Sequence, residues 1–210
     1  MGRVVAIFDV DRTLVQSSTE QLFFRYLVRR GQLPMIRAMG YLGRLAARPG
    51  ERFRDKTYLK GQPVEEIERL ALDCYREVIA ARLSSQARAC VQEHQAQGHE
   101  IIILTGSLSF LMQPLKEELG ADWLIATALA REDHCFTGEI TGLHPRGENK
   151  RRLILSHPQL GGWDLARSYA YGDDIQDFPL LEIIGHPVAV NPSWRLKRLA
   201  LKNRWPIRYF

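Results

Sequence analysis

The sequence predicts an α/β fold in which a parallel sheet carries one long helical insertion. Short apolar runs of strand length alternate with segments of helical spacing, which is typical of parallel strands joined by right-handed crossovers. The block 16–83 separates the first two apolar runs and is too long for an ordinary crossover. We therefore expect this block to form a helical subdomain inserted into the main domain, and 210 residues are enough for both.

Apolar spacing predicts the first strand and the helices of the insertion. Residues 4–8 are five consecutive apolar residues, three of them β-branched, as in a strand buried on both faces. Residues 20–30 have helical spacing, and the segment 34–47 is basic and amphipathic. An apolar face that runs from Val64 to Ala81 indicates one long helix.

The second half of the chain continues the alternation of strands and helices. A helix over about 84–97 stops at Gly98, and the apolar run 101–104 is the second strand. The remaining expected elements are a helix at about 109–119, a short strand at 123–126, a hairpin around 137–139, a helix at 150–155, strands at 168–171 and 187–190, and a helix at 194–202.

Composition and charge narrow the class of protein. Apolar residues make up 45% and charged residues 25% of the chain, and no apolar stretch approaches the roughly 20 residues of a membrane span. A strand that begins by residue 4 leaves no room for a signal peptide. Cys74, Cys90 and Cys135 are an odd, widely spaced set, which indicates reduced thiols in a cytoplasmic protein. The net charge of +5 suits small anionic substrates and does not indicate nucleic acid.

Polar side chains follow three of the predicted strands. In open α/β sheets, ligands bind beyond the carboxyl ends of the strands, so these side chains are expected to converge on one site. They are Asp9 and Asp11 after the first strand, Thr105 and Gly106 after the second, and Asp173 and Asp177 after a later one.

The first pair of carboxylates has two possible interpretations when taken alone. Asp9 and Asp11 point the same way from an extended backbone, and they would repel each other unless a cation or a proton lay between them. That arrangement suits a bound Mg²⁺ with one aspartate as nucleophile and the other as acid/base. The alternative is two solvated aspartates in a loop.

Four motifs in order resemble those of the haloacid-dehalogenase superfamily, and more narrowly its subfamily IB, the phosphoserine-phosphatase-like branch. The motifs are Asp9–Leu14, Leu104–Ser107, Lys150 and Gly172–Asp177. The resemblance covers nearly the whole chain. It implies a Rossmann-like three-layer core formed by residues 1–15 and 84–210, with a C1-type helical cap at 16–83.

The resemblance implies a phosphatase mechanism with Mg²⁺ as cofactor. Asp9 would attack phosphorus and form an aspartyl-phosphate, and Asp11 would serve as general acid and then base. The metal would be held by Asp9, the backbone carbonyl of Asp11, and Asp173. Asp177 would support the metal site or orient Lys150.

Phosphate binding would fall to the second and third motifs. Thr105 and the Gly106 N–H would bind phosphate oxygens, and Lys150 would pair with Asp9 and the phosphoryl group. Lys150 also lies in a basic run, where a solvated surface lysine is the alternative. Arg12 stands where relatives often have a small or neutral residue; it could contact an anionic substrate or turn outward.

The expected substrate is a small phosphorylated metabolite. Phosphoserine phosphatases carry a glutamate that recognises the substrate amino group, and the matching position here is Ser18, with Glu20 two residues later. Phosphoserine itself is therefore an alternative, as is a phospholipid headgroup bound where the arginines of 34–48 meet a membrane surface. A further alternative is a catalytically silent binding protein with the same fold. The oligomeric state is not predicted.

Several other polar or aromatic residues invite a functional interpretation that the pattern does not support. His94 and His99 flank a helix end and are predicted to be solvated, and the cluster 133–135 has no second pair of metal ligands. The aromatic residues Trp194, Trp205 and Phe210 are expected to take part in packing rather than in a ligand site.

Overall fold

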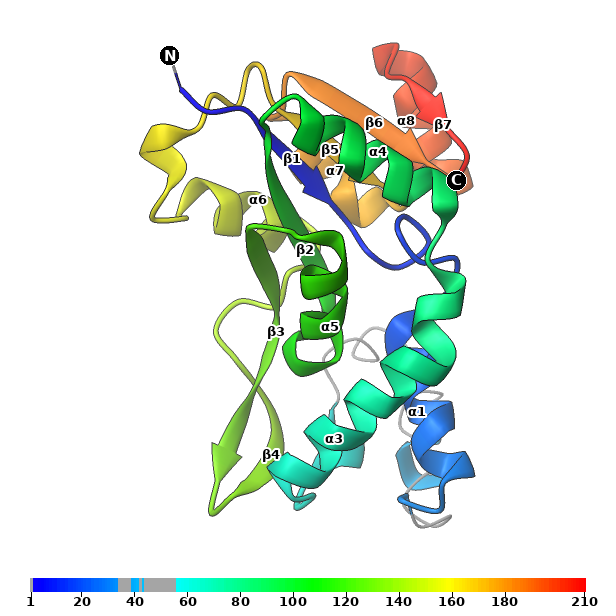
Figure 1. Cartoon of the computed structure of the whole chain (residues 1–210). Helices are drawn as coiled ribbons and strands as arrows, with labels where there is room; N and C mark the ends of the chain where they lie inside the picture. Colours follow the sequence, from blue (N-terminus) through cyan, green and yellow to red (C-terminus); the bar gives the residue numbers. More distant parts are fainter. Residues whose placement is uncertain (1, 34–38, 42, 44–55) are drawn as a thin grey trace.

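A seven-stranded sheet forms the centre of the molecule. The computed structural model describes residues 2–33, 39–41, 43 and 56–210 (Figure 1). The strand order is β4-β3-β2-β1-β5-β6-β7, and only β3 and β4 pair antiparallel. The strands are β1 (Val5–Phe8), β2 (Glu100–Leu108), β3 (Trp123–Glu132), β4 (Cys135–Thr141), β5 (Tyr169–Gly172), β6 (His186–Val190) and β7 (Ile207–Arg208).

Helices cover both faces of this sheet, as the alternation in the sequence predicted. The helices with described bounds are α1 (Thr19–Arg29), α3 (Val64–Cys74), α4 (Ser85–Ala96), α5 (Ser109–Leu119), α6 (Glu148–Leu155), α7 (Phe178–Leu181) and α8 (Trp194–Asn203). The helices α4 to α8 cover the sheet, whereas α1 and α3 belong to the inserted segment. Among the residues that the structure describes, no helix has the length and apolar character needed to cross a membrane.

The central strand β1 shows why the sheet needs two covering layers. Its residues are fully buried and alternate between the faces, so that Phe8 joins one apolar cluster and Ile7 the other. The first cluster includes residues of α4 and α5, and the second includes residues of α6, α7 and α8. The predicted three-layer α/β core is confirmed.

The two connections between the inserted segment and the core lie next to each other. Gln16 N donates to Arg82 O (3.0 Å), and Ser84 N donates to Leu14 O (3.0 Å), so the two connections run side by side. Between them, α1 and α3 lie beyond the end of β1 (Figure 1). This pairing supports the division of the chain at 15–16 and 83–84, which remains a prediction. The arginines 37, 44 and 48 of the basic segment lie outside the described residues.

The predicted long helix changes its winding before it reaches the core. α3 ends at Cys74 and continues as a π-turn (Tyr75–Ile79) and a 3₁₀ turn (Ala80–Arg82). Its predicted apolar face is buried from Val64 to Cys74, whereas Val78 is half-buried and Ala81 is exposed. The change of winding occurs in the last turns before the connection back to α4.

The predicted hairpin lies at a different place along the chain. Its turn is formed by Asp133 and His134, and the segment 137–139 lies inside β4. β3 is correspondingly longer than the predicted 123–126. Gly138 was a misleading turn signal: a Cβ there would lie 3.1 Å from the Thr57 Cα, so the glycine permits a close approach of two backbones.

This hairpin is attached to the inserted segment. Backbone hydrogen bonds of 2.7 to 2.9 Å join Gly61 and Gln62 to Phe136, and Val64 to His134. Residues 61–64 therefore extend the hairpin as a short paired segment, and the insertion contacts the core through β4 as well as through its two connections.

His94 is buried, contrary to the prediction. It is 5% exposed, and its Nε2 lies 2.8 Å from the Tyr171 hydroxyl while its Nδ1 lies 2.8 Å from Nδ1 of His99. His94 follows Cys90 and Val91 at helical spacing, and so it shares the buried face of α4.

Trp194 is also placed differently from the prediction. It is 64% exposed, because α8 turns a different face, with Leu196 and Ala200, toward the sheet. Trp205 and Phe210 pack against the two apolar clusters as predicted.

Candidate active site

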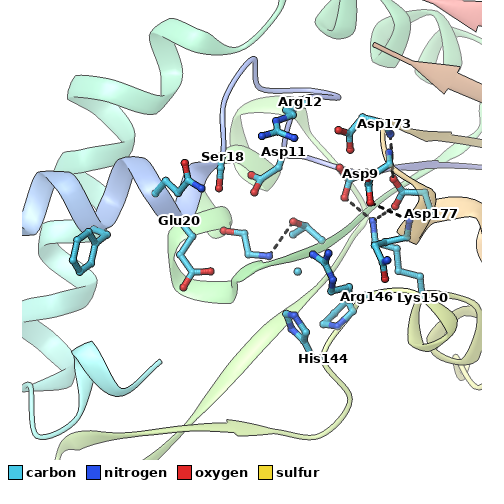
Figure 2. Close-up of a pocket in the computed structure, with 18 of the residues that line it drawn as sticks. Asp9, Asp11, Arg12, Ser18, Glu20, His144, Arg146, Lys150, Asp173 and Asp177 are labelled. Carbon is cyan, nitrogen blue, oxygen red and sulfur yellow. Dashed lines mark hydrogen bonds and ion pairs between the residues drawn. The ribbon is translucent and has the colours of Figure 1, made fainter. Parts of the chain in front are cut away.

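A cavity of about 630 Å³ lies at the carboxyl ends of the central strands (Figure 2). Parallel strands bring their carboxyl ends to one edge of the sheet, and the site residues expected from the sequence meet there. The cavity is lined by all of them: Asp9, Asp11, Arg12, Thr105, Gly106, Lys150, Asp173 and Asp177.

Lys150 is the centre of a buried charge network. It lies in the first turn of α6 and is only 3% exposed, so the alternative of a solvated lysine is wrong. Its Nζ donates to Asp9 Oδ1 and to Asp177 Oδ1, both at 2.6 Å. Burial alone would lower the pKa of Lys150, but the carboxylates of Asp177 and Asp9 outweigh burial and raise it. The lysine is therefore held as a cation between two carboxylates.

Asp177 is fixed by donors on both of its oxygens. Besides the contact with Lys150, its Oδ2 accepts hydrogen bonds from the backbone N–H groups of Asp173 (3.1 Å) and Asp174 (3.0 Å). A Cβ at Gly172 would lie 2.6 Å from the Asp177 Cβ, so only glycine leaves room for this carboxylate at the end of β5. Asp177 thus orients Lys150 and shapes the loop that carries Asp173.

The pKa values of the remaining buried carboxyls are raised. Burial raises the pKa of Asp9 to about 7, with the charge of Asp177 adding to it and Lys150 opposing it. Burial and then the charge of Asp9 raise the pKa of Asp173 to about 9. The ionised forms of Asp9 and Asp173 repel each other, and a cation between them would stabilise both.

The donor set fits a hard divalent cation. Carboxylate oxygens of Asp9, Asp173 and Asp177 all lie within 4.8 Å of one another, and all three residues are buried. Oxygen ligands of this kind are those that Mg²⁺ prefers. Since both Asp177 oxygens already accept hydrogen bonds, Asp9 and Asp173 are the better candidates for direct ligands.

The side chain of Asp11 faces the start of α1 instead of this carboxylate group. Its Oδ1 accepts hydrogen bonds from Thr19 N (2.9 Å) and Thr19 Oγ1 (2.7 Å). The Thr19 hydroxyl also lies 2.8 Å from Ser107 Oγ. Sequence reasoning missed Thr19, although a carboxylate at a helix start is a common way to satisfy the first backbone donors.

The second motif lies within β2, whereas the prediction placed it after the strand. The register between β2 and β3 shifts between Leu104 and Leu108, so the backbone at 105–107 departs from the regular ladder. Thr127 Oγ1 donates to the Gly106 carbonyl at 2.7 Å, and Ser107 N donates to Thr105 Oγ1 at 3.1 Å.

His144 completes this side of the cavity. Its Nδ1 lies 2.8 Å from Thr127 Oγ1, and a Cβ at Gly106 would lie 3.3 Å from its Cε1. Sequence reasoning missed both Thr127 and His144, because no local pattern connects a strand threonine with a histidine that follows the next strand.

Arg12 lines the cavity at its rim beside Asp11 (Figure 2). Its φ of 61° is in the left-handed region, which favours glycine over residues with a Cβ. Asn191 Nδ2 donates to the Arg12 carbonyl at 3.0 Å and so holds this turn in place.

The inserted segment contributes the opposite wall of the cavity. Ser18 and Glu20 line it, and Lys56 Nζ donates to both oxygens of Glu20 at 2.6 and 2.5 Å. Tyr58 Oη donates to Glu20 at 3.4 Å. Burial raises the pKa of Glu20, and the charge of Lys56 opposes this. The negative charge of Glu20 is therefore already paired with the positive charge of Lys56.

The chain is similar to several known proteins. A family model described as haloacid dehalogenase-like hydrolase matches residues 6–182. "Inhibition of morphological differentiation protein" of Streptomyces azureus is 31% identical over 221 residues, covering 100% of this chain and 79% of that protein. "Phosphoserine phosphatase SerB1" of Mycobacterium tuberculosis (strain ATCC 25618 / H37Rv) is 31% identical over 216 residues, covering 98% of this chain and 70% of that protein.

Solved structures also resemble this chain over its whole length. One of them is a protein of unknown function from Bordetella pertussis Tohama I, with a TM-score of 0.88 and 27% identity, and the match covers 99% of each chain.

Proposed function

This chain belongs to the haloacid dehalogenase-like hydrolase family, and from that premise we propose that it is a Mg²⁺-dependent phosphatase of small phosphomonoesters. The observation that carries the proposal is the buried Asp9, which Lys150 holds at 2.6 Å in a cavity at the strand ends. A carboxylate fixed in this way, with a cation on one oxygen, suits nucleophilic attack on a phosphoryl group.

The proposed reaction is hydrolysis in two displacements. The Asp9 oxygen that does not contact Lys150 attacks phosphorus in line; the bond between phosphorus and the alcohol oxygen breaks as the aspartyl-phosphate forms. Asp11 gives its proton to the leaving alcohol oxygen and then takes one from the attacking water. Water displaces Asp9 from phosphorus, and inorganic phosphate is released.

The metal site proposed for this reaction uses residues that are already clustered. Asp9, Asp173 and the backbone carbonyl of Asp11 would hold Mg²⁺, with Asp177 as their support. When bound, Mg²⁺ supplies positive charge that offsets the phosphoryl oxygens and the buried carboxylates.

Phosphate oxygens would be bound by donors from two elements. Thr105 Oγ and Gly106 N–H come from β2, and Lys150 comes from α6. Arg12 at the rim would attract an anionic group of the substrate, since its backbone turn is fixed and its side chain borders the cavity.

The environment of Glu20 bears on which alcohol the phosphatase would release. The similarity to a protein named phosphoserine phosphatase makes phosphoserine a second candidate. Lys56 occupies both oxygens of Glu20, however, and so Glu20 does not offer an unneutralised carboxylate to an amino group. This contact favours a phosphorylated metabolite other than phosphoserine.

We also propose a cytoplasmic location. Cys74, Cys90 and Cys135 are all free thiols in the structure, which suits a reducing compartment.

A direct test is hydrolysis of p-nitrophenyl phosphate by the purified protein with Mg²⁺, followed by a screen of phosphorylated metabolites that includes phosphoserine. Asp9→Asn should lower kcat by at least about 10³-fold, because the nucleophile is lost. Asp133→Asn is the matched control, since Asp133 lies in the exposed hairpin turn and asparagine tolerates its φ of 45°. Undiminished activity of Asp9→Asn would refute the mechanism.

A further inference from the structure

We propose that His144 and Thr127 form a hydrogen-bond chain that directs the Thr105 hydroxyl as a donor toward the phosphate. His144 and Thr127 are positioning residues in this proposal, which rests on the proposed function. The chain runs from the segment before α6, across β3, to the phosphate-binding end of β2.

The direction of each hydrogen bond follows from the partners. A carbonyl oxygen only accepts, so the single hydrogen of the Thr127 hydroxyl is committed to Gly106 O at 2.7 Å. The 2.8 Å contact between Thr127 Oγ1 and His144 Nδ1 then requires Nδ1 to carry the proton and donate. The contact thereby assigns the His144 tautomer with hydrogen on Nδ1.

The chain continues through one peptide group. The Gly106 carbonyl and the Ser107 N–H belong to the same planar unit, so anchoring the oxygen fixes the direction of the N–H. That N–H donates to Thr105 Oγ1 at 3.1 Å. With a lone pair engaged by this donor, the Thr105 hydroxyl keeps its own hydrogen for an acceptor in the cavity.

The peptide needs this support because of its place in the sheet. The register between β2 and β3 shifts at this point, so the Thr127 side chain binds the Gly106 carbonyl. Thr105, Ser107, Thr127 and His144 are all buried, and hydrogen bonds that are aligned in a buried chain strengthen one another.

His144 is itself fixed from the side of the catalytic lysine. Its carbonyl accepts hydrogen bonds from Arg146 N (2.8 Å) and Asn149 Nδ2 (3.1 Å). Asn149 directly precedes Lys150, so the chain joins the segment that carries Lys150 to the hydroxyl of Thr105.

The first test measures binding of inorganic phosphate in the presence of Mg²⁺ by calorimetry, together with kcat and KM. Thr127→Val interrupts the hydrogen-bond chain between His144 and Thr105 and should weaken phosphate binding about 3- to 10-fold, which is the usual effect of one hydrogen bond. Thr127→Ser keeps the hydroxyl and should restore binding. Thr137→Val is the matched control, since Thr137 lies in β4 and its hydroxyl contacts Ala130 O instead of the cavity.

A double variant tests whether Thr127 acts through Thr105. If it does, Thr105→Val with Thr127→Val should bind phosphate no more weakly than Thr105→Val alone. Additive losses, or unchanged binding by Thr127→Val, would overturn the proposal.

Two substitutions of His144 separate its ring nitrogens. His144→Asn places an amide nitrogen near the Nδ1 position and should bind phosphate within about twofold of the wild type, whereas His144→Gln places it near Nε2 and should resemble Thr127→Val. If His144→Gln instead bound phosphate more tightly than His144→Asn, His144 would contact the phosphate directly through Nε2, and the proposed hydrogen-bond chain would be overturned.

Phosphate binding also separates this inference from the proposed function. A wild-type protein that binds phosphate but hydrolyses no phosphomonoester contradicts the phosphatase proposal, and the phosphate affinities of the variants still test the hydrogen-bond chain. A wild-type protein that binds no phosphate contradicts both.

Discussion

Thr19 donates two hydrogen bonds to the same carboxylate oxygen of Asp11, one from its backbone N–H at 2.9 Å and one from its hydroxyl at 2.7 Å. Thr19 is the first residue of α1, and Asp11 lies beside the proposed nucleophile. The inserted segment thus holds the proposed acid/base of the core domain.

Removing the Thr19 hydroxyl should slow catalysis without loss of the fold. Thr19→Val keeps the backbone donor but loses the hydroxyl contact, so Asp11 is less well oriented. We expect kcat to fall about 10-fold with KM within about twofold. Steady-state kinetics with p-nitrophenyl phosphate measures both; an equal loss in Asp11→Ala and in Asp11→Ala with Thr19→Val would confirm that Thr19 acts through Asp11.

Thr13→Val tests a second buried hydroxyl, through its effect on stability. Within the described part of the chain, the buried Thr13 hydroxyl has no hydrogen-bond partner. A methyl group there should raise the free energy of unfolding by about 1 kcal/mol, as measured by urea denaturation. A loss of more than about 1 kcal/mol would show that the hydroxyl has a partner after all.

The fold and much of the site follow from local patterns in the sequence. The apolar runs predict β1 and β2, and the carboxyl ends of parallel strands must meet, so Asp9, Thr105 and Asp173 were expected together. His94 could also have been predicted as buried, because it shares the helical face of Val91.

The residues that were missed depend on contacts that no sequence motif records. Thr19 contacts Asp11, and Thr127 contacts His144, only after the chain has folded. The hairpin was misplaced for a similar reason, since Gly138 is required by its approach to Thr57 and not by a turn.

Lys150→Met should destabilise the protein in a pH-dependent way. It leaves the Asp9 and Asp177 carboxylates buried without their cation, and we expect a loss of about 3 kcal/mol in the free energy of unfolding at pH 8. The loss should be smaller at pH 6, because burial raises the pKa of Asp9 and removal of Lys150, which opposes this rise, raises it further, so that a proton can neutralise Asp9. Lys202→Met on the exposed end of α8 is the control, and an equal loss in both variants would contradict the role of the buried pairs.

Binding of Mg²⁺ should release protons. Without the metal, the pKa of Asp9 is raised to about 7 and that of Asp173 to about 9, so at pH 7 part of this site is protonated. The cation needs ionised carboxylates, and its affinity should therefore rise between pH 6 and pH 9. Calorimetry in buffers of different ionisation enthalpy measures the released protons.

Two further measurements check the metal prediction. EDTA should abolish hydrolysis, and added Mg²⁺ should restore it. Asp173→Asn should bind Mg²⁺ more weakly and with a smaller dependence on pH; an unchanged pH dependence in this variant would contradict the assignment of the raised pKa to the metal site.

His94 should make the protein sensitive to acid. Burial lowers the pKa of His94 from 6.5 to about 4, so the unfolded chain binds more protons than the folded protein between these values. The contribution of His94 to the free energy of unfolding is zero above pH 6.5, and it becomes more destabilising as the pH falls toward 4. Urea denaturation between pH 7.5 and 5 should show this decline.

His94→Gln should flatten the decline, because it removes the titrating group. His134→Asn in the exposed turn should leave the slope as in the wild type. If both variants keep the wild-type slope, other groups cause the acid sensitivity.

The pairing of residues 61–64 with His134 and Phe136 has a consequence for protein engineering. Exchanging residues 16–83 between relatives as a single cassette would place these backbone hydrogen bonds between segments of two different proteins, unless the β3–β4 hairpin were exchanged with it. A chimera that transfers both segments should fold and carry the donor's substrate preference, whereas one that transfers only the first should lose its closely packed cavity wall.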